Sequence, residues 1–373
     1  LTLFPRNRKG EPMTQTKRQH YVPQFLLRYF SDLSNVKSKS IISMYILEKN
    51  IIKEKIPIKS VCYCENIYGD DDVVEKMFSK MESEWARVLN QINTSNRHII
   101  KIKDKSNIAS FIAFQYLRTK KREAFLERMT DEWIKYIDSK DTVLFQNKLE
   151  NNSSIAINLS LIQFRNFRQY LSDLDYVILD NKSNIEFIVS DNPVIFINIF
   201  SPNNFGVHSI GNVLWIPISP RKLLLLYDRK AINLTASGFE ISSDETIKAI
   251  NSYQYIVMDK LLFNIHDDLN KYIFYKDAIK SRAIHENKRA VQTFHTENDG
   301  LLVFLFPDFL NKYIDLSFIR LDSLLARIPC FDRYNISRYK NVEQLYLYRK
   351  MFRDVLDWET FKNCILEYWN RRI

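Results

Sequence analysis

The sequence predicts an α+β protein in which an N-terminal helical region packs on a mixed, mostly antiparallel sheet and a C-terminal helical extension follows. Three observations support this fold class. Apolar residues recur at helical spacing from Val73 to Ile92, which predicts an amphipathic helix. From about Asp175 the chain changes to short apolar runs bounded by turn residues, as in strands. The aromatic-rich segment from Val342 to Trp369 returns to a helical pattern.

The first half of the chain contains two predicted strands followed by two predicted helices. Ile41 to Leu47 and Ile51 to Ile58 flank Glu48-Lys49-Asn50, which predicts a hairpin. An acidic loop, Gly69 to Asp72, precedes the first helix and suits its N-terminal dipole. We expect the second helix to begin with Ser106 as its N-cap and to continue, with a break, to Ile137.

The second half of the chain is mainly a series of predicted strands. Tyr176 to Leu179 and Ile185 to Val189 flank a polar run and predict a hairpin. Three more strands are expected at Val194 to Ile199, Val213 to Ile218 and Leu223 to Tyr227. A short helix after Ser243 is expected to lead into a strand from Tyr255 to Met258.

No proline- or serine-rich linker divides the chain, so we expect one α+β core over residues 13–260 and a mixed or helical extension over 261–373. Leu1 to Pro12 come directly before Met13 and contain no apolar run of signal-peptide length. We expect these twelve residues to be a remnant of upstream translation or of cloning.

Composition excludes several classes of function. Only 6 of 373 residues are glycine, and neither glycine-rich phosphate-binding motif is present. No apolar run reaches eighteen residues, so we expect no membrane partner. The four cysteines, at positions 62, 64, 330 and 364, match neither a zinc set nor a disulfide framework, which favours a cytoplasmic protein. The net charge of +10 fits a nucleic-acid partner, and it fits a bias toward Lys, Asn and Ile equally well.

Several short motifs occur in a recognisable order. They are His-Tyr-Val-Pro-Gln from His20, Val61 to Tyr68 ending in Asn-Ile-Tyr, Phe-Ile-Ala-Phe-Gln-Tyr-Leu-Arg-Thr from Phe111, Ser-Asp-Asn-Pro from Ser190, and Pro-Ile-Ser-Pro from Pro217. Together they resemble the bacterial family called domain of unknown function 4238, which has no well-established biochemical role. The resemblance covers about Lys17 to Asp259.

Polar residues within these motifs suggest a chemical site. Gln115 lies on the apolar face of its predicted helix, and Glu75 and Glu82 lie seven residues apart on one helix side. Asp191 follows a strand, and His20 precedes a proline-fixed turn. Carboxylates with an imidazole are ligands suited to Mg²⁺ or Mn²⁺.

The resulting hypothesis is a metal-dependent phosphodiesterase, specifically a nuclease that acts in bacterial defence against phages or plasmids. Glu82 and Asp191, with Glu75 as a third candidate, are expected to bind the metal. His20 is expected to act as general base or ligand, Gln115 as an orienting group, and Arg118 as a contact to phosphate, since a guanidinium binds phosphate oxygens well.

Each of these residues also has a purely structural interpretation. His20 and Gln115 could satisfy buried hydrogen-bonding groups, Glu82 could pair with Arg118 across a helix hairpin, and Asp191 could accept backbone N–H groups. The alternative function is therefore a non-catalytic sensor or scaffold, in which these residues form a structural network. Its C-terminal aromatic helices would bind a protein partner, and a homo-oligomer is also open.

Overall fold

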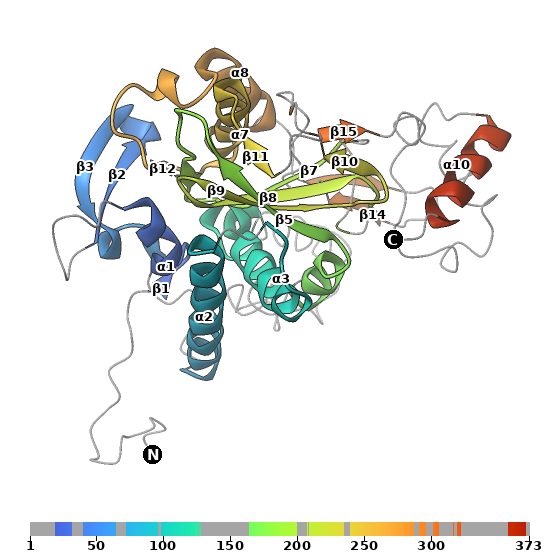
Figure 1. Ribbon diagram of the computed structural model, residues 1–373, viewed down its shortest axis with the longest axis horizontal. Helices are drawn as coiled ribbons and strands as arrows, with labels where there is room; N and C mark the ends of the chain where they lie inside the picture. The colour runs from blue at the N-terminus through green and yellow to red at the C-terminus, as the bar shows by residue number, and fades with distance from the viewer. Residues whose placement is uncertain are drawn as a thin grey trace.

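The computed structural model shown in Figure 1 describes a large part of the chain. The described residues are 19–31, 40–64, 72–95, 98–125, 127, 164–199, 207, 209–234, 239–286, 291–295, 301–305, 316, 319–321 and 357–370.

A five-stranded sheet forms the centre of the described structure. Its strand order is β11 (Glu240–Ile241), β5 (Asp175–Asn181), β9 (Lys222–Tyr227), β8 (Asn212–Ser219) and β7 (Ile195–Asn198). The β11–β5 pair is parallel, and the other neighbours are antiparallel. The runs Leu223–Leu226 and Val213–Ile216 are buried throughout, because both faces of this sheet are covered.

A second, four-stranded antiparallel sheet lies beside the first. Its order is β3 (Ile51–Pro57), β2 (Ile41–Ile46), β12 (Leu261–Phe263) and β6 (Val189–Ser190). The predicted hairpin between Ile41 and Ile58 is confirmed: the residues between β2 and β3 form the 3-10 turn Leu47–Lys49, followed by Asn50 with a φ of 48°. Asparagine tolerates this left-handed conformation better than most residues.

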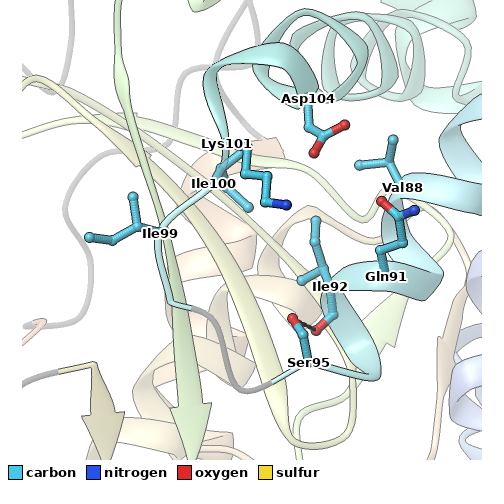
Figure 2. A pocket seen from close by; sticks show the side chains of 8 residues that line it. All are labelled: Val88, Gln91, Ile92, Ser95, Ile99, Ile100, Lys101 and Asp104. Carbon is cyan, nitrogen blue, oxygen red and sulfur yellow. Dashed lines mark hydrogen bonds between the residues drawn. The ribbon is translucent and has the colours of Figure 1, made fainter.

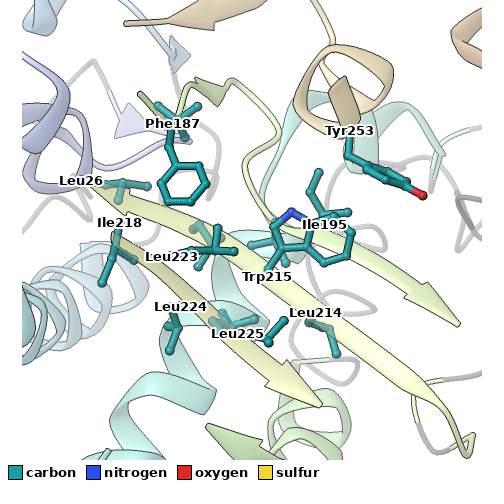
Figure 3. Packing of buried hydrophobic residues seen from close by; sticks show 14 of the residues in the cluster. Leu26, Phe187, Ile195, Leu214, Trp215, Ile218, Leu223, Leu224, Leu225 and Tyr253 are labelled. Carbon is teal, nitrogen blue, oxygen red and sulfur yellow. The ribbon is translucent and has the colours of Figure 1, made fainter. Parts of the chain in front are cut away.

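Helices cover the two faces of the central sheet (Figure 1). On one face lie α2 (Asp72–Asn93) and α3 (Ile102–Leu117), and on the other lie α7 (Asp244–Val257) and α8 (Tyr275–Glu286). Trp215 of β8 packs edge-on against Tyr253 of α7, with ring centroids 5.2 Å apart (Figure 3). On the opposite face, Phe78 of α2 and Phe114 of α3 lie 4.2 Å apart by the same measure. The predicted α+β class, with helices on a mostly antiparallel sheet, is thus confirmed.

Several smaller elements also occur in the described chain. They are the pairs β1 (Gln19–His20) with β4 (Tyr63–Cys64), β10 (Ile232–Leu234) with β15 (Ile319–Leu321), and β13 (Val291–His295) with β14 (Leu301–Leu305), and the helices α1 (Gln24–Leu27) and α10 (Trp358–Asn370). None of the described helices combines the length and the apolar character needed to cross a membrane. Residues 342–356 of the aromatic-rich segment lie outside the described residues.

The structure corrects the predicted start of the second helix. This helix, α3, begins at Ile102 rather than after Ser106, and Asp104 supplies the acidic group of its first turn. Ser106 lies within the helix, where its backbone carbonyl accepts a hydrogen bond from the Ser110 hydroxyl. The predicted continuation to Ile137 lies largely outside the described residues.

The predicted hairpin after Tyr176 is wrong. The Asn181 side chain donates to the Ile185 carbonyl and accepts from the Ser183 N–H, so the chain turns locally instead of folding back along β5. β5 therefore pairs with β9, and Val189 joins β12 in the second sheet.

The strand predicted from Tyr255 to Met258 is also wrong, because helix α7 continues through Val257. Tyr255, Ile256 and Val257 are all buried. A short apolar run buried on every side has no period that distinguishes a helix from a strand. Arg282 of α8 then satisfies the end of α7, donating to the Met258 carbonyl at 2.6 Å.

Candidate functional site

A cavity of about 410 Å³ lies between the N-terminal segment, α2 and the end of α3. Exposed residues, including Arg28 and Ser79, stand at its edge, so it opens to solvent. The polar residues that line it are Gln19, His20, Gln24, Arg28, Ser79, Glu82, Ser83 and Arg118. Three of the residues predicted from sequence, His20, Glu82 and Arg118, therefore meet at one cavity.

Local backbone structure fixes the position of His20. Its strand β1 pairs with β4, placing His20 opposite Tyr63. Pro23, with φ of −67°, then serves as the N-cap of the short helix α1. The Gln24 side-chain nitrogen lies 3.3 Å from His20 Nε2 and 3.4 Å from Nδ1. The imidazole is consequently held beside the cavity by a strand pair below it and an amide next to it.

A continuous hydrogen-bond network supports the cavity from behind. Gln115 is fully buried, and its side-chain nitrogen donates to the Tyr21 carbonyl at 3.0 Å. Its Oε1 accepts from Arg118 Nε at 3.2 Å, and Arg118 Nη1 donates to Glu82 Oε1 at 2.5 Å. Gln115 therefore connects the backbone next to His20 with the ion pair between α3 and α2.

The Arg118–Glu82 ion pair is buried on one side only. The Arg118 side chain is 4% exposed and that of Glu82 is 33% exposed. The guanidinium also lies 4.5 Å from the centre of the Phe114 ring, an arrangement that favours a cation. Arg118 is therefore committed to Glu82, Gln115 and Phe114, whereas one side of Glu82 faces the cavity.

The environment of His20 favours the neutral imidazole. Burial lowers the pKa of His20 below its ordinary value of 6.5. A hydrogen bond to the Lys59 backbone and the charge of Glu82 oppose this effect, and the charges of Arg118 and Arg28 add to it. His20 is thus unprotonated near pH 7 and can accept a proton there.

Asp191 does not line this cavity. It is 1% exposed, and its two carboxylate oxygens accept the backbone N–H groups of Asp259, Lys260 and Leu261 at 2.8, 2.8 and 3.0 Å. Burial raises the pKa of Asp191 to about 6, although the three N–H donors oppose the rise. The convergence of Asp191 with Glu82 that the metal hypothesis requires is therefore not seen, because Asp191 fixes the turn between α7 and β12.

The neighbours of Asp191 have similar structural roles. The Ser190 hydroxyl donates to Gln254 Oε1 at 2.7 Å, and Gln254 in turn donates to the Pro193 carbonyl at 2.9 Å. The Asn192 side chain donates to the Val257 carbonyl at 3.1 Å. The Ser-Asp-Asn-Pro motif therefore attaches the segment after β6 to the end of α7.

The candidate metal ligands do not assemble within the described residues. There, no group of three or more His, Cys, Asp or Glu side chains could hold a metal ion. Glu75 belongs to α2, but its side chain lies outside the described part of the chain. Neither Cys62 nor Cys64 forms a disulfide, and Cys62 is buried.

Gln24 and Arg28 are among the lining residues that sequence reasoning did not single out. Arg28 is exposed at the edge of the cavity, and its Nη2 donates to Gln24 Oε1 at 3.3 Å. The signal was present, since His20, Gln24 and Arg28 are spaced four residues apart across the proline-fixed turn and the helix after it. Arg28 is exposed and can therefore contact a phosphate, the role that had been expected of Arg118.

A second cavity, of about 290 Å³, lies between the end of α2 and the start of α3 (Figure 2). Val88, Ile92 and Ile100 supply much of its apolar lining, and Ile99 stands at its outer edge. Lys101 and Asp104 contribute one charge of each sign. No histidine is among the residues that line this cavity, whereas His20 lines the first cavity. We therefore take the first cavity as the candidate site for proton transfer.

Comparison with known proteins gives one match. The family model described as "Protein of unknown function (DUF4238)" matches residues 18–260, in agreement with the resemblance seen in the sequence motifs. No curated protein and no solved structure matches the chain. The matched region contains His20, Gln24, Arg28, Glu82 and Arg118, and it covers more than half of the sequence. The chain belongs to the DUF4238 family.

Proposed function

We propose that this protein is a phosphodiesterase that cleaves nucleic acid at the cavity lined by His20, Arg28 and Glu82. One observation carries the proposal: an imidazole, a carboxylate and an exposed guanidinium line the same open cavity, and burial lowers the pKa of that imidazole. An imidazole can remove a proton from an attacking hydroxyl, and a guanidinium can bind the phosphate that the hydroxyl attacks. The net charge of +10 supports binding of a polyanion.

The residues have distinct roles in this proposal. His20 is the general base, and Glu82 stabilises the imidazolium that forms, because its charge raises the pKa of His20. Arg28 contacts the phosphate, a role first expected of Arg118. Arg118 instead holds Glu82 in place, and Gln115 acts as the orienting group by joining Arg118 to the Tyr21 backbone.

A divalent metal ion does not fit the described donors well. Mg²⁺ prefers several oxygen ligands in octahedral geometry. Glu82 is the one carboxylate among the described residues lining the cavity, and Arg118 already occupies one of its oxygens. A cation beside Glu82 would also lie near the guanidinium of Arg118. The proposal therefore assigns no step to Mg²⁺ or Mn²⁺.

The first test is cleavage of labelled single-stranded RNA and DNA by the purified full chain. We expect cleavage of at least one substrate and a loss of at least about 100-fold in His20→Ala, since a positioned base contributes about 100-fold or more. His266→Ala is the matched control, because His266 is a histidine that contacts Ser43 and Asn264 instead of this cavity. If both nucleic acids stay intact with and without Mg²⁺ or Mn²⁺, the proposal is wrong.

A role in bacterial defence against phages or plasmids is part of the same proposal. Phage plating on cells that express wild type, His20→Ala or His266→Ala tests it. We expect protection from the wild type and the control variant but not from His20→Ala. Equal protection by all three variants would show that the defence role does not depend on this cavity.

The alternative function, a non-catalytic sensor or scaffold, has one observation in its favour. Asp191, Ser190 and Gln254 use their polar atoms on backbone groups or on one another, as a structural network would. In that case a partner protein would bind the C-terminal region, as expected from its aromatic helices. Removal of residues 357–373 would then abolish partner capture. In the full chain, His20→Ala would behave like wild type in every assay.

A further inference from the structure

We propose that the substrate is RNA and that the attacking nucleophile is the 2′-hydroxyl of the RNA itself. This inference rests on the proposed function, because it specifies the substrate class of the same cavity. The inference has two grounds. The first is the positive charge near His20, and the second is the kind of nucleophile that an imidazole can activate.

The first step concerns positive charge at the cavity. Stabilising the transition state of phosphate cleavage requires positive charge near the phosphate oxygens. Here Arg28 provides that charge at the exposed edge of the cavity, whereas the charge of Arg118 is paired with Glu82. Arg28 Nη2 donates to Gln24 Oε1 at 3.3 Å, and the Gln24 side-chain nitrogen lies 3.3 Å from His20 Nε2, so Gln24 links the guanidinium to the imidazole. The positive charge beside the proposed base is therefore supplied by a side chain of the protein.

The second step concerns the nucleophile. Water is a poor nucleophile, and an enzyme that uses it on a phosphodiester commonly activates it with a metal ion. The 2′-hydroxyl of RNA is already attached next to the phosphate, so its attack is intramolecular and gains the large advantage of a fixed orientation. A single imidazole base such as His20 is then sufficient to start the reaction. DNA lacks this hydroxyl and offers no such route.

The reaction balances with groups at the cavity and solvent water. His20 takes the proton of the 2′-hydroxyl, and the 2′-oxygen uses its electron pair to bond to phosphorus. The bond from phosphorus to the 5′-oxygen breaks, and the leaving oxygen keeps the bonding pair and takes a proton from water in the open cavity. His20 returns its proton to the hydroxide that remains. The products are a 2′,3′-cyclic phosphate and a 5′-hydroxyl, with no oxidant or further reactant.

The test uses a DNA oligonucleotide that contains one ribonucleotide, together with the all-DNA oligonucleotide of identical sequence. Both are incubated with the purified full chain in excess EDTA, and the products are identified by mass spectrometry. We expect cleavage only after the ribonucleotide and a fragment that ends in a 2′,3′-cyclic phosphate. We also expect Arg28→Ala to cut at least about 10-fold more slowly, while Arg229→Ala, the loss of an exposed arginine after β9, leaves the rate unchanged.

The outcomes separate this inference from the proposed function. Cleavage of the all-DNA strand, or cleavage that requires Mg²⁺ and yields no cyclic phosphate, overturns the RNA inference while supporting a phosphodiesterase. Absence of cleavage of either oligonucleotide and of longer RNA, with or without metal, overturns both. Arg28→Ala and His20→Gln are first checked by circular dichroism, and a folded variant that retains the wild-type rate counts against the assigned residue.

Discussion

The substitution Asp191→Asn should change how stability depends on pH. In the folded protein, burial raises the pKa of Asp191 from its ordinary value of 3.8 to about 6. Between these two values the folded state binds more protons than the unfolded state, so the contribution of Asp191 to stability is full below pH 3.8 and is lost as pH rises through 6. One pKa unit corresponds to about 1.4 kcal/mol, and the loss is therefore about 3 kcal/mol.

Urea denaturation at pH 4, 5, 6 and 7, followed by fluorescence of the five tryptophans, measures this effect. Because asparagine does not titrate, the free energy of unfolding of wild type minus that of Asp191→Asn should fall by about 2.4 kcal/mol from pH 4 to pH 7, since part of the full effect is already lost at pH 4. The matched control is Asp268→Asn. Asp268 is exposed, and hydrogen bonds from Asn270 lower its pKa, so its contribution is lost as pH falls and has the opposite sign.

Two results would refute this reasoning about Asp191. A difference that rises from pH 4 to pH 7 would mean that the three backbone N–H donors outweigh burial and hold the carboxylate pKa low. Stabilisation of wild type by millimolar Mg²⁺ that disappears in Asp191→Asn would mean that the carboxylate binds a metal ion rather than the turn before β12.

Three further predictions concern the cavity. Gln115→Leu should lower the free energy of unfolding by about 1 to 3 kcal/mol in urea, because the Tyr21 carbonyl loses its donor in a buried place; a change below 0.5 kcal/mol would contradict this. Glu82→Gln should lower the pKa of His20 in an NMR titration, since the charge of Glu82 raises it, and an unchanged titration would show that the two groups are not coupled. For wild type, kcat/KM on RNA should rise with pH through a value below 6.5 and then level off, and a profile that falls over this range would exclude His20 as the base.

Short apolar runs were the least certain part of the fold prediction, because a strand and a buried helix end look alike in sequence. Leu223 to Leu226 forms one buried run next to turn residues, and it is a strand as predicted. Tyr255 to Val257 is buried just as completely but is the end of a helix. Local pattern cannot separate these cases, because both runs are apolar and buried and neither shows a period. The hairpin prediction after Tyr176 failed for a different reason: the Asn181 side chain bonds to Ser183 and Ile185 and forms a local turn.

The candidate site was predictable where its residues share helices and short spacings. Gln115 lies in the last turn of α3, Arg118 caps that helix three residues later, and Glu82 occupies the facing position on α2, so their meeting follows from a helix hairpin. Asp191 could not be placed in this way, because its backbone partners lie 68 to 70 residues further along the chain. A strand-end aspartate has the same appearance in sequence whether it binds a ligand or a distant turn.

The two groups of family-like motifs therefore divide into different tasks. The polar side chains of the Ser-Asp-Asn-Pro motif hydrogen-bond to the end of α7 and to the turn after it, so we expect their removal to lower stability. The His20 motif places an imidazole and the exposed Arg28 at an open cavity, where a ligand can reach them. Under the proposed function, a ligand from outside the chain occupies this cavity. The proposed RNA ligand would supply both a phosphate for Arg28 to bind and a hydroxyl for His20 to deprotonate.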